Sequence, residues 1–271
     1  MFDYDQSAPL DIQEVGREPR GEITVQDISF AVPGSDRRVG AYLVTPPGPG
    51  PFAGVLYVHW YEPPKPSSTR TQFVEEAVRM AERGVVSLLV DTMWSPHDWY
   101  VTRDLNDDYD TSTRQVIELR RALDVLTSRP GVDAGRISLV GHDFGGMFGS
   151  IVAGWDDRVQ SYNIIAATPR FQEWYLFGAK PEGGALDAYI RRISELDPIT
   201  HIKRAQNAAF FFQFALTDRF VPEEKALEFY EAAPGPKQIA WYDTDHEMHV
   251  PQAQEDRVTW LSERLGLQVA A

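Results

Sequence analysis

The chain has 271 residues, of which 43% are hydrophobic, so it can bury a sizeable core as one large domain or two small ones. Its net charge of −14 argues against nucleic acid and anionic membrane surfaces as partners, and the absence of cysteine excludes disulfides, thiolate metal sites and a cysteine nucleophile. No stretch approaches the roughly 18 to 20 consecutive apolar residues of a membrane span, and the acidic N-terminus does not resemble a signal peptide. We therefore expect a cytoplasmic protein that binds a small molecule.

The predicted elements alternate between strands and helices over most of the chain. Two early runs rich in β-branched and aromatic residues, separated by a turn signal, predict an antiparallel pair. The later strands are interleaved with helical patterns, which predicts a mostly parallel sheet covered on both faces. The expected strands are 22–32, 37–46, 53–60, 85–91, 136–143, 159–167, 208–218 and 237–246, and the expected helices are 69–84, 112–131, 145–154, 222–233 and 251–265.

One segment, residues 168–205, departs from this alternation. It contains Trp174, Tyr175 and the helical pattern GALDAYIRRISEL. An insertion of this length between two strands usually serves as a lid. With no linker, repeat or low-complexity tract in the sequence, we predict one domain over residues 1–271 with a lid at about 168–205.

Polar side chains stand at the carboxyl ends of four of the predicted strands. His59 comes after GVLYV, Asp143 after RISLV, Asp218 after the Phe-rich strand, and His246 after IAWYDTD. In a parallel sheet the carboxyl ends of the strands meet at one edge, where binding sites form. We expect these side chains to lie together.

The stretch VGHDFGG, residues 140–146, has glycines on both sides of Asp143. This pattern indicates a strand that turns sharply into a helix and lifts its central residue towards the helix N-terminus, a place that suits an anion. In the simpler alternative, Asp143 is only the N-cap of the following helix. A cap alone does not require glycines on both sides, which favours the first interpretation.

The order of Asp143, Asp218 and His246, each after its own strand, resembles the α/β-hydrolase superfamily. That resemblance implies a mostly parallel sheet of about eight strands with helices on both faces and a short lid. The overall pattern resembles the dienelactone hydrolase and acetyl-esterase branch. The GxDxG elbow preceded by His142 resembles instead the epoxide hydrolases and haloalkane dehalogenases, which use an aspartate nucleophile.

The elbow resemblance implies that Asp143 attacks a saturated carbon, opening a strained ring or displacing a leaving group to form an alkyl-enzyme ester. His246, oriented by Asp218, would activate the water that hydrolyses the ester. The backbone N–H groups of Trp60 and Phe144 would form the oxyanion hole. Lid tyrosines protonate the leaving atom in epoxide hydrolases, and the lid here offers Tyr175 and Tyr189.

Two residues depart from the pattern of those aspartate enzymes. Phe144 stands where they usually have the tryptophan that holds a leaving halide, which argues against dehalogenation. Trp60 follows His59 where they usually have glycine. Ring opening is compatible with both changes.

Two other functions stay open. An esterase or lactonase of the dienelactone hydrolase type would use Asp143 or His246 as a general base, and an inactive hydrolase-fold protein would only bind a ligand. No cofactor is expected, and His246 and His249 on one turn do not make a metal site. A homodimer is left open. The residues expected to line the substrate pocket are His59, Tyr61, His142, Trp94, Trp174, Tyr175 and Tyr189.

Overall fold

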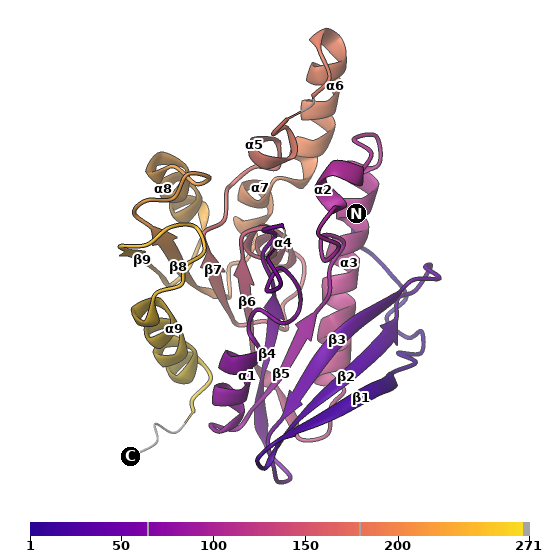
Figure 1. The fold of residues 1–271 in the computed structure, drawn as a ribbon, viewed down its shortest axis with the longest axis vertical. Coiled ribbons are helices and arrows are strands. Elements are labelled where there is room, and N and C mark those ends of the chain that lie inside the picture. Colours follow the sequence, from indigo (N-terminus) through magenta and orange to yellow (C-terminus); the bar gives the residue numbers. More distant parts are fainter. Residues whose placement is uncertain (64, 179, 268–271) are drawn as a thin grey trace.

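A single sheet of nine strands forms the centre of the molecule in a computed structural model that describes residues 1–63, 65–178 and 180–267 (Figure 1). Its strand order is β1-β2-β3-β5-β4-β6-β7-β8-β9. The strands are β1 (Gln13–Arg20), β2 (Ile23–Ala31), β3 (Arg38–Thr45), β4 (Phe52–Val58), β5 (Val85–Val90), β6 (Val132–His142), β7 (Ser161–Ile165), β8 (Ala209–Ala215) and β9 (Lys237–Tyr242).

The pairing of the strands confirms the mostly parallel sheet. From β5 to β9 every neighbouring pair is parallel, whereas β1, β2 and β3 pair antiparallel with one another and β3 pairs antiparallel with β5. The sequence indicated about eight strands and missed β1. Its sequence, QEVGREPR, is charged and almost wholly exposed, so this edge strand carries no hydrophobic alternation that a pattern search could find.

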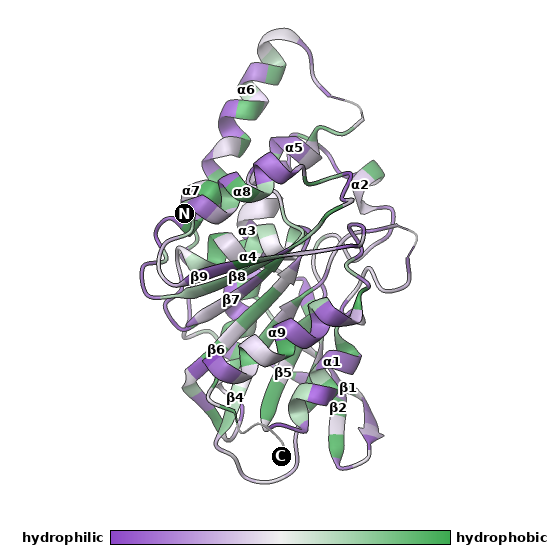
Figure 2. Ribbon diagram, turned by 90° about the vertical axis from the view of Figure 1, so that its left-hand side faces the viewer, coloured by the Kyte–Doolittle hydropathy of each residue, from purple (hydrophilic) through white to green (hydrophobic). Residues whose placement is uncertain are grey.

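Helices cover both faces of the sheet and enclose two hydrophobic cores. One core packs helices α1 (Val74–Ala81) and α9 (Pro251–Arg264) against the sheet, and the other packs α3 (Asp108–Thr127), α4 (Phe144–Ala153) and α8 (Glu223–Ala232). β4 and β5 are buried along their whole length, and Figure 2 shows the central strands coloured mostly as hydrophobic. Continuous apolar runs are what a strand covered on both faces requires.

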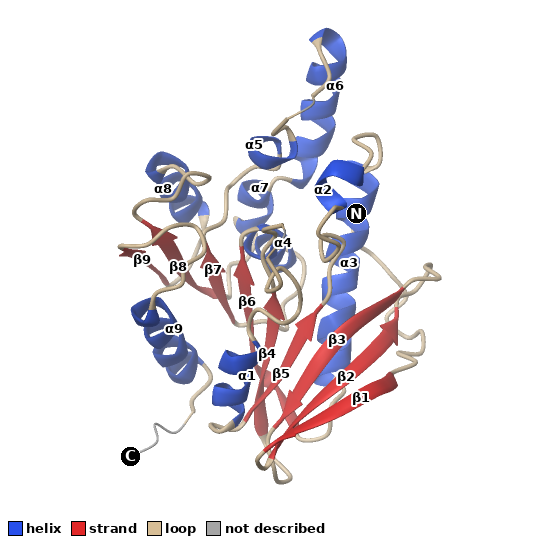
Figure 3. Ribbon diagram, in the orientation of Figure 1, coloured by secondary structure: helices blue, strands red, loops and turns tan. Residues whose placement is uncertain are grey.

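The segment between β7 and β8, where the lid is expected, carries helices α5 (Gln172–Tyr175), α6 (Gly183–Ile193) and α7 (Pro198–Ile202) and the 3₁₀ turn η1 (Ser194–Leu196). Residue 179 of this segment lies outside the described residues. Figure 3 shows α5 above the carboxyl ends of the central strands and α6 projecting further from the sheet. A short helix, α2 (Trp99–Thr102), lies on the same side. None of the described helices is long and apolar enough to cross a membrane.

Candidate active site

Asp143 occupies a strained turn between β6 and α4. Its backbone has φ 58° and ψ −121°, a region that residues other than glycine rarely adopt. A Cβ on Gly141 would lie 2.3 Å from the carbonyl oxygen of Gly145, and a Cβ on Gly145 would lie 2.2 Å from that of Val58. The glycines are therefore needed for this turn, as the sequence predicted.

The side chain of Asp143 does not act as a helix cap. It makes no capping hydrogen bond to α4, and its Oδ2 instead accepts a hydrogen bond of 2.8 Å from the backbone N–H of Tyr61. This N–H belongs to the loop after β4, not to the helix that begins at Phe144. Asp143 occupies the N-cap position of α4, but the simpler interpretation, in which its side chain only caps the helix, is wrong.

His246 lies between Asp218 and Asp143. Its Nδ1 is 2.8 Å from Oδ2 of Asp218, whose other oxygen accepts the backbone N–H groups of Phe220 and Val221. Because a carboxylate only accepts, Nδ1 carries the proton and the lone pair of the neutral ring is on Nε2. Nε2 is 3.9 Å from Oδ1 of Asp143, which is too long for a direct hydrogen bond. The structure thus brings together the three residues that the sequence singled out.

Burial dominates the electrostatics of Asp143. It raises the pKa of this carboxyl to about 7, although the charge of His246 and the N–H groups of Tyr61 and Phe144 act to lower it. Burial also lowers the pKa of His246, but the hydrogen bond to Asp218 and the charges of Asp143, Asp218 and Glu62 outweigh it, so the pKa is raised overall. Asp143 is therefore only partly ionised at neutral pH, unlike an exposed aspartate, whose ordinary pKa is near 4.

The N–H of Trp60, expected in the oxyanion hole, does not point at Asp143, whereas that of the next residue does. The N–H of Trp60 donates to Oε1 of Gln72 at 2.9 Å, so it is already used. The N–H of Tyr61 points at Asp143 instead, and the N–H of Phe144 acts on the same carboxyl. Successive backbone N–H groups of an extended chain point in opposite directions. A prediction that is off by one residue therefore names an N–H that points away from Asp143.

His142, expected in the pocket, lies on the buried side of the elbow. Its Nε2 donates to the backbone oxygen of His246 at 2.9 Å, and its Nδ1 accepts from Nε2 of Gln72 at 2.6 Å. Its ring stacks on Trp60 with 5.1 Å between ring centroids, and burial holds its pKa well below the ordinary value. A neutral His142 thus links the loop after β4 to the loop that carries His246.

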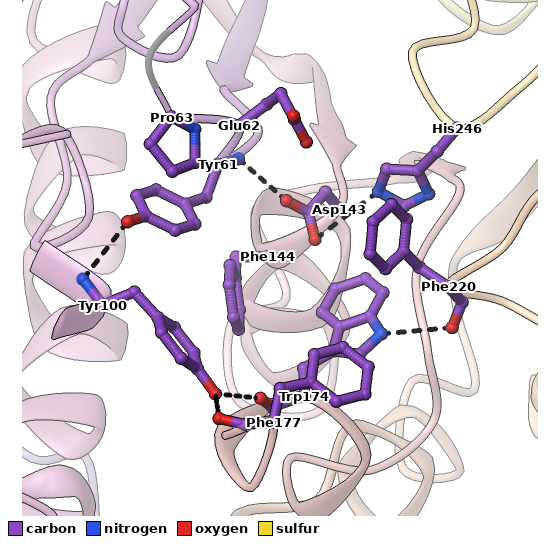
Figure 4. Close-up of a pocket in the computed structure, with 10 residues that line it drawn as sticks. All are labelled: Tyr61, Glu62, Pro63, Tyr100, Asp143, Phe144, Trp174, Phe177, Phe220 and His246. Carbon is purple, nitrogen blue, oxygen red and sulfur yellow. Dashed lines mark hydrogen bonds and ion pairs between the residues drawn. The ribbon is translucent and has the colours of Figure 1, made fainter. Parts of the chain in front are cut away.

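A cavity of about 260 Å³ opens beside Asp143 and His246 (Figure 4). Of the residues expected to line it, the structure places Tyr61 and Trp174 there, together with Asp143, Phe144 and His246. Five other lining residues were not predicted, although four of them stand within three residues of a predicted site residue and Tyr100 stands six residues after Trp94. The missed residues are Glu62, Pro63, Tyr100, Phe177 and Phe220.

His59 and Trp94 do not reach the cavity. His59 is buried, with Nε2 at 2.9 Å from Oγ of Ser95, and burial lowers its pKa to about 4. The indole N–H of Trp94 donates to the carbonyl oxygen of His59 at 3.2 Å, and its ring packs against Phe144 and Phe148. Trp94 therefore supports Phe144, which lines the cavity, and the ring of His59 packs against Trp94.

The two tyrosines expected to protonate the leaving atom are also outside the cavity. The hydroxyl of Tyr175 is buried against Oγ of Ser112 at 2.8 Å, and that of Tyr189 donates to Oδ2 of Asp108 at 2.5 Å. These hydrogen bonds fasten the lid segment to α3. The sequence placed both residues in the right segment, but it does not show which face of a helix turns towards the pocket.

Comparisons with known proteins identify the fold. No family model matches the chain, and no curated protein matches it either. Among solved structures, an acetyl xylan esterase from Paenibacillus sp. R4 is 20% identical, with 95% of this chain and 90% of that chain covered and a TM-score of 0.78. Acetyl xylan esterase 1 from Thermoanaerobacterium sp. JW/SL YS485 is 15% identical, with 96% and 89% covered and a TM-score of 0.78.

The esterase domain of a Rhodothermus marinus protein is 17% identical, with 90% of this chain and 98% of that chain covered and a TM-score of 0.65. At such identities the likeness shows the fold alone. The chain therefore has the α/β-hydrolase fold that the sequence predicted, and the function has to be argued from the site.

Proposed function

We propose that this chain is a hydrolase in which Asp143 attacks a saturated carbon and forms an alkyl ester that His246 then helps water to hydrolyse. The observation that carries the proposal is the hydrogen bond from the Tyr61 N–H to Oδ2 of Asp143. In an esterase the oxyanion donors must receive an oxygen of the substrate. Here a donor in that position is occupied by an oxygen of the enzyme's own carboxylate.

The same hydrogen bond assigns different roles to the two oxygens of Asp143. Oδ1 faces His246 and is the attacking atom, while Oδ2 becomes the carbonyl oxygen of the ester. When water adds to this ester, negative charge develops on Oδ2, where the N–H of Tyr61 already points. The donor is thus placed for the second step without rearrangement.

The separation between His246 and Asp143 suits a base that acts through water. A gap of 3.9 Å between Nε2 and Oδ1 excludes direct proton transfer and favours a water molecule held by Nε2 beside the ester carbon. Forming the ester also removes the charge of Asp143, one of the causes that raise the pKa of His246. The pKa of His246 consequently falls after the first step, when the neutral base is needed.

A second candidate is an esterase in which Asp143 is a general base for water. The raised pKa of Asp143, about 7, favours it, because a general base is most effective when its pKa is near the working pH. The esterases among the similar solved structures fit this candidate too. The occupied donor position argues against it.

Trapping the ester distinguishes the two candidates. We expect His246→Gln to leave the first step intact and to slow ester hydrolysis by about a thousandfold, because only the second step needs the base. Incubation with styrene oxide or 2-phenylaziridine, followed by mass spectrometry of the peptide that contains Asp143, should reveal the added mass. Wild-type protein, in which the ester turns over, and Asp143→Asn, which cannot form it, are the controls. If neither probe gives an adduct on Asp143, the aspartate-nucleophile proposal is overturned.

A further inference from the structure

The cavity beside Asp143 is aromatic and acidic. Six of its ten lining residues are aromatic, and the only ionisable side chains apart from tyrosine are Asp143, His246 and Glu62; no lysine or arginine is among these ten. Figure 4 shows Glu62 at the same rim of the cavity as Pro63 and Tyr61, and its charge is felt at His246. Aromatic faces and carboxylates both attract cations. The aromatic lining residues are Tyr61, Tyr100, Phe144, Trp174, Phe177 and Phe220.

Among the described residues that line the cavity, the tyrosine hydroxyls are already engaged as donors. Tyr61 donates to the backbone oxygen of His97 at 2.9 Å, and burial raises its pKa. The hydroxyl of Tyr100 lies 2.7 Å from the backbone oxygens of both Trp174 and Phe177, which share its single proton. Neither proton is directed at the space in front of Asp143, so neither tyrosine is placed to protonate a leaving atom.

The position of His246 does not suit this task either. Displacement at a saturated carbon is in line, so the leaving atom departs on the side of the carbon opposite to Oδ1. Nε2 of His246 lies 3.9 Å from Oδ1, on the side of the attacking atom. A leaving atom on the far side of the carbon would therefore depart into a cavity most of whose lining side chains are aromatic.

The cavity thus combines an aromatic lining, the carboxylate of Glu62 at its rim and tyrosine hydroxyls that are already engaged. We infer that the substrate carries a positive charge on its leaving atom, as a protonated aziridine or a related strained ammonium ring does. This inference rests on the proposed function of Asp143. A ring nitrogen that arrives protonated needs no acid from the enzyme. Its charge is stabilised by the aromatic faces and by Glu62, whereas a neutral epoxide gains little from either.

The two steps balance in atoms and charge. A lone pair of Oδ1 forms the new C–O bond, the C–N bond breaks, and its electron pair stays on nitrogen, so anion and cation become a neutral amino ester. Water then adds to the ester carbon while His246 takes its proton and returns it to the departing alcohol oxygen. The proton released as Asp143 ionises again is taken up by the amine. The product is a protonated amino alcohol.

A matched pair of probes tests the inference. 2-Phenylaziridine and styrene oxide share one carbon skeleton and differ in the ring heteroatom. For each we would measure kcat/KM at pH 7 and divide it by the rate of the same probe with free acetate in water, which removes intrinsic reactivity. We expect the normalised ratio to favour the aziridine by at least about a hundredfold.

Glu62→Gln should lower that ratio by about tenfold, because it removes one negative charge from the cavity. Glu263→Gln, at an exposed glutamate of α9 outside the cavity lining, makes the same change in net charge and should leave the ratio unchanged. Inhibition by unreactive compounds tests binding alone. The cation 2-phenylethylamine should inhibit more strongly than neutral 2-phenylethanol, and Glu62→Gln should reduce that difference. Thermal unfolding checks that each variant is folded.

The outcomes separate this inference from the proposed function. Adducts on Asp143 with both probes, but a normalised ratio near one that Glu62→Gln does not change, would overturn the cationic substrate and leave the aspartate nucleophile standing. Adducts with neither probe would overturn both. A ratio that favours the aziridine and falls in Glu62→Gln, but not in Glu263→Gln, supports the inference.

Discussion

Two neighbouring residues at the turn between β6 and α4 have different surroundings: His142 faces the protein interior and Asp143 faces the cavity. On the buried side, both ring nitrogens of His142 have a partner: one accepts from Gln72 and the other donates to the backbone of His246. On the pocket side, Asp143 has one oxygen held by Tyr61 while the other stands 3.9 Å from His246. His142 therefore holds the neighbouring loops in place, whereas Oδ1 of Asp143 faces the cavity and can react with a substrate.

The largest effect expected on the pocket side follows from Asp143→Asn. It removes the attacking oxygen, so turnover of 2-phenylaziridine should fall by more than about 10⁴-fold. Product formation is measured by chromatography. Residual turnover within a factor of about ten of the wild type would show that Asp143 is not the nucleophile.

The same variant should be more stable above neutral pH. Asp143 has a pKa of about 7 in the folded state and an ordinary pKa near 4 when unfolded, so the folded state holds the extra proton between these values. The free energy of unfolding of the wild type therefore falls as the pH rises from about 4 to about 7. Asparagine does not titrate, and at pH 8 the variant should gain roughly 2 to 4 kcal/mol in urea unfolding. A loss of stability at pH 8 would contradict the raised pKa.

Asp218→Asn should act on the second step. Losing the carboxylate releases the Nδ1–H of His246 and lets the ring adopt the wrong tautomer, so ester hydrolysis should slow by about a thousandfold. Rapid-quench mass spectrometry would then show the adduct on Asp143 accumulating. Equal slowing of ester formation would place Asp218 in the first step instead.

On the buried side the effect should be smaller. His142→Phe keeps an aromatic ring beside Trp60 but removes the hydrogen bonds to Gln72 and to the backbone of His246. We expect kcat to fall by about ten- to a hundredfold with KM little changed, because the loops after β4 and β9 lose their common support. A change confined to KM would place His142 in contact with substrate.

The pH dependence of the first step should be the mildest of these effects. Only ionised Asp143 attacks, so with a pKa of about 7 the rate of ester formation with neutral styrene oxide should rise about tenfold from pH 6 to pH 8. Stopped-flow fluorescence of the tryptophans, with Trp174 in the cavity, offers a signal. A flat profile would mean that Asp143 is fully ionised at pH 6.

The sequence predicted the fold and the cluster of Asp143, Asp218 and His246 better than the pocket that surrounds them. Hydrophobic periodicity predicted the parallel strands and glycine spacing predicted the turn at Asp143, because strands and turns depend mainly on residues that are close in sequence. The direction of a backbone N–H after a strand also depends on the path of the loop, which turns the N–H of Tyr61 rather than that of Trp60 towards Asp143. The pKa of Asp143 depends on burial by segments far away in sequence, so no local pattern reports it.

The residues between β7 and β8 show the same limit. Trp174 reaches the cavity while the next residue, Tyr175, turns to Ser112 in α3. That difference is set by packing between segments about 60 residues apart in the chain. Composition and helical pattern identified the segment but not the side chain that faces the substrate.

A single turnover in ¹⁸O-labelled water, with protein in excess over 2-phenylaziridine, shows whether Asp143 forms the ester. If Asp143 forms the ester, water attacks its carboxyl carbon, so the label appears in the peptide that contains Asp143 and the product carries unlabelled oxygen. Label found only in the product, with Asp143 unlabelled, would mean that water attacked the substrate directly and would contradict the account.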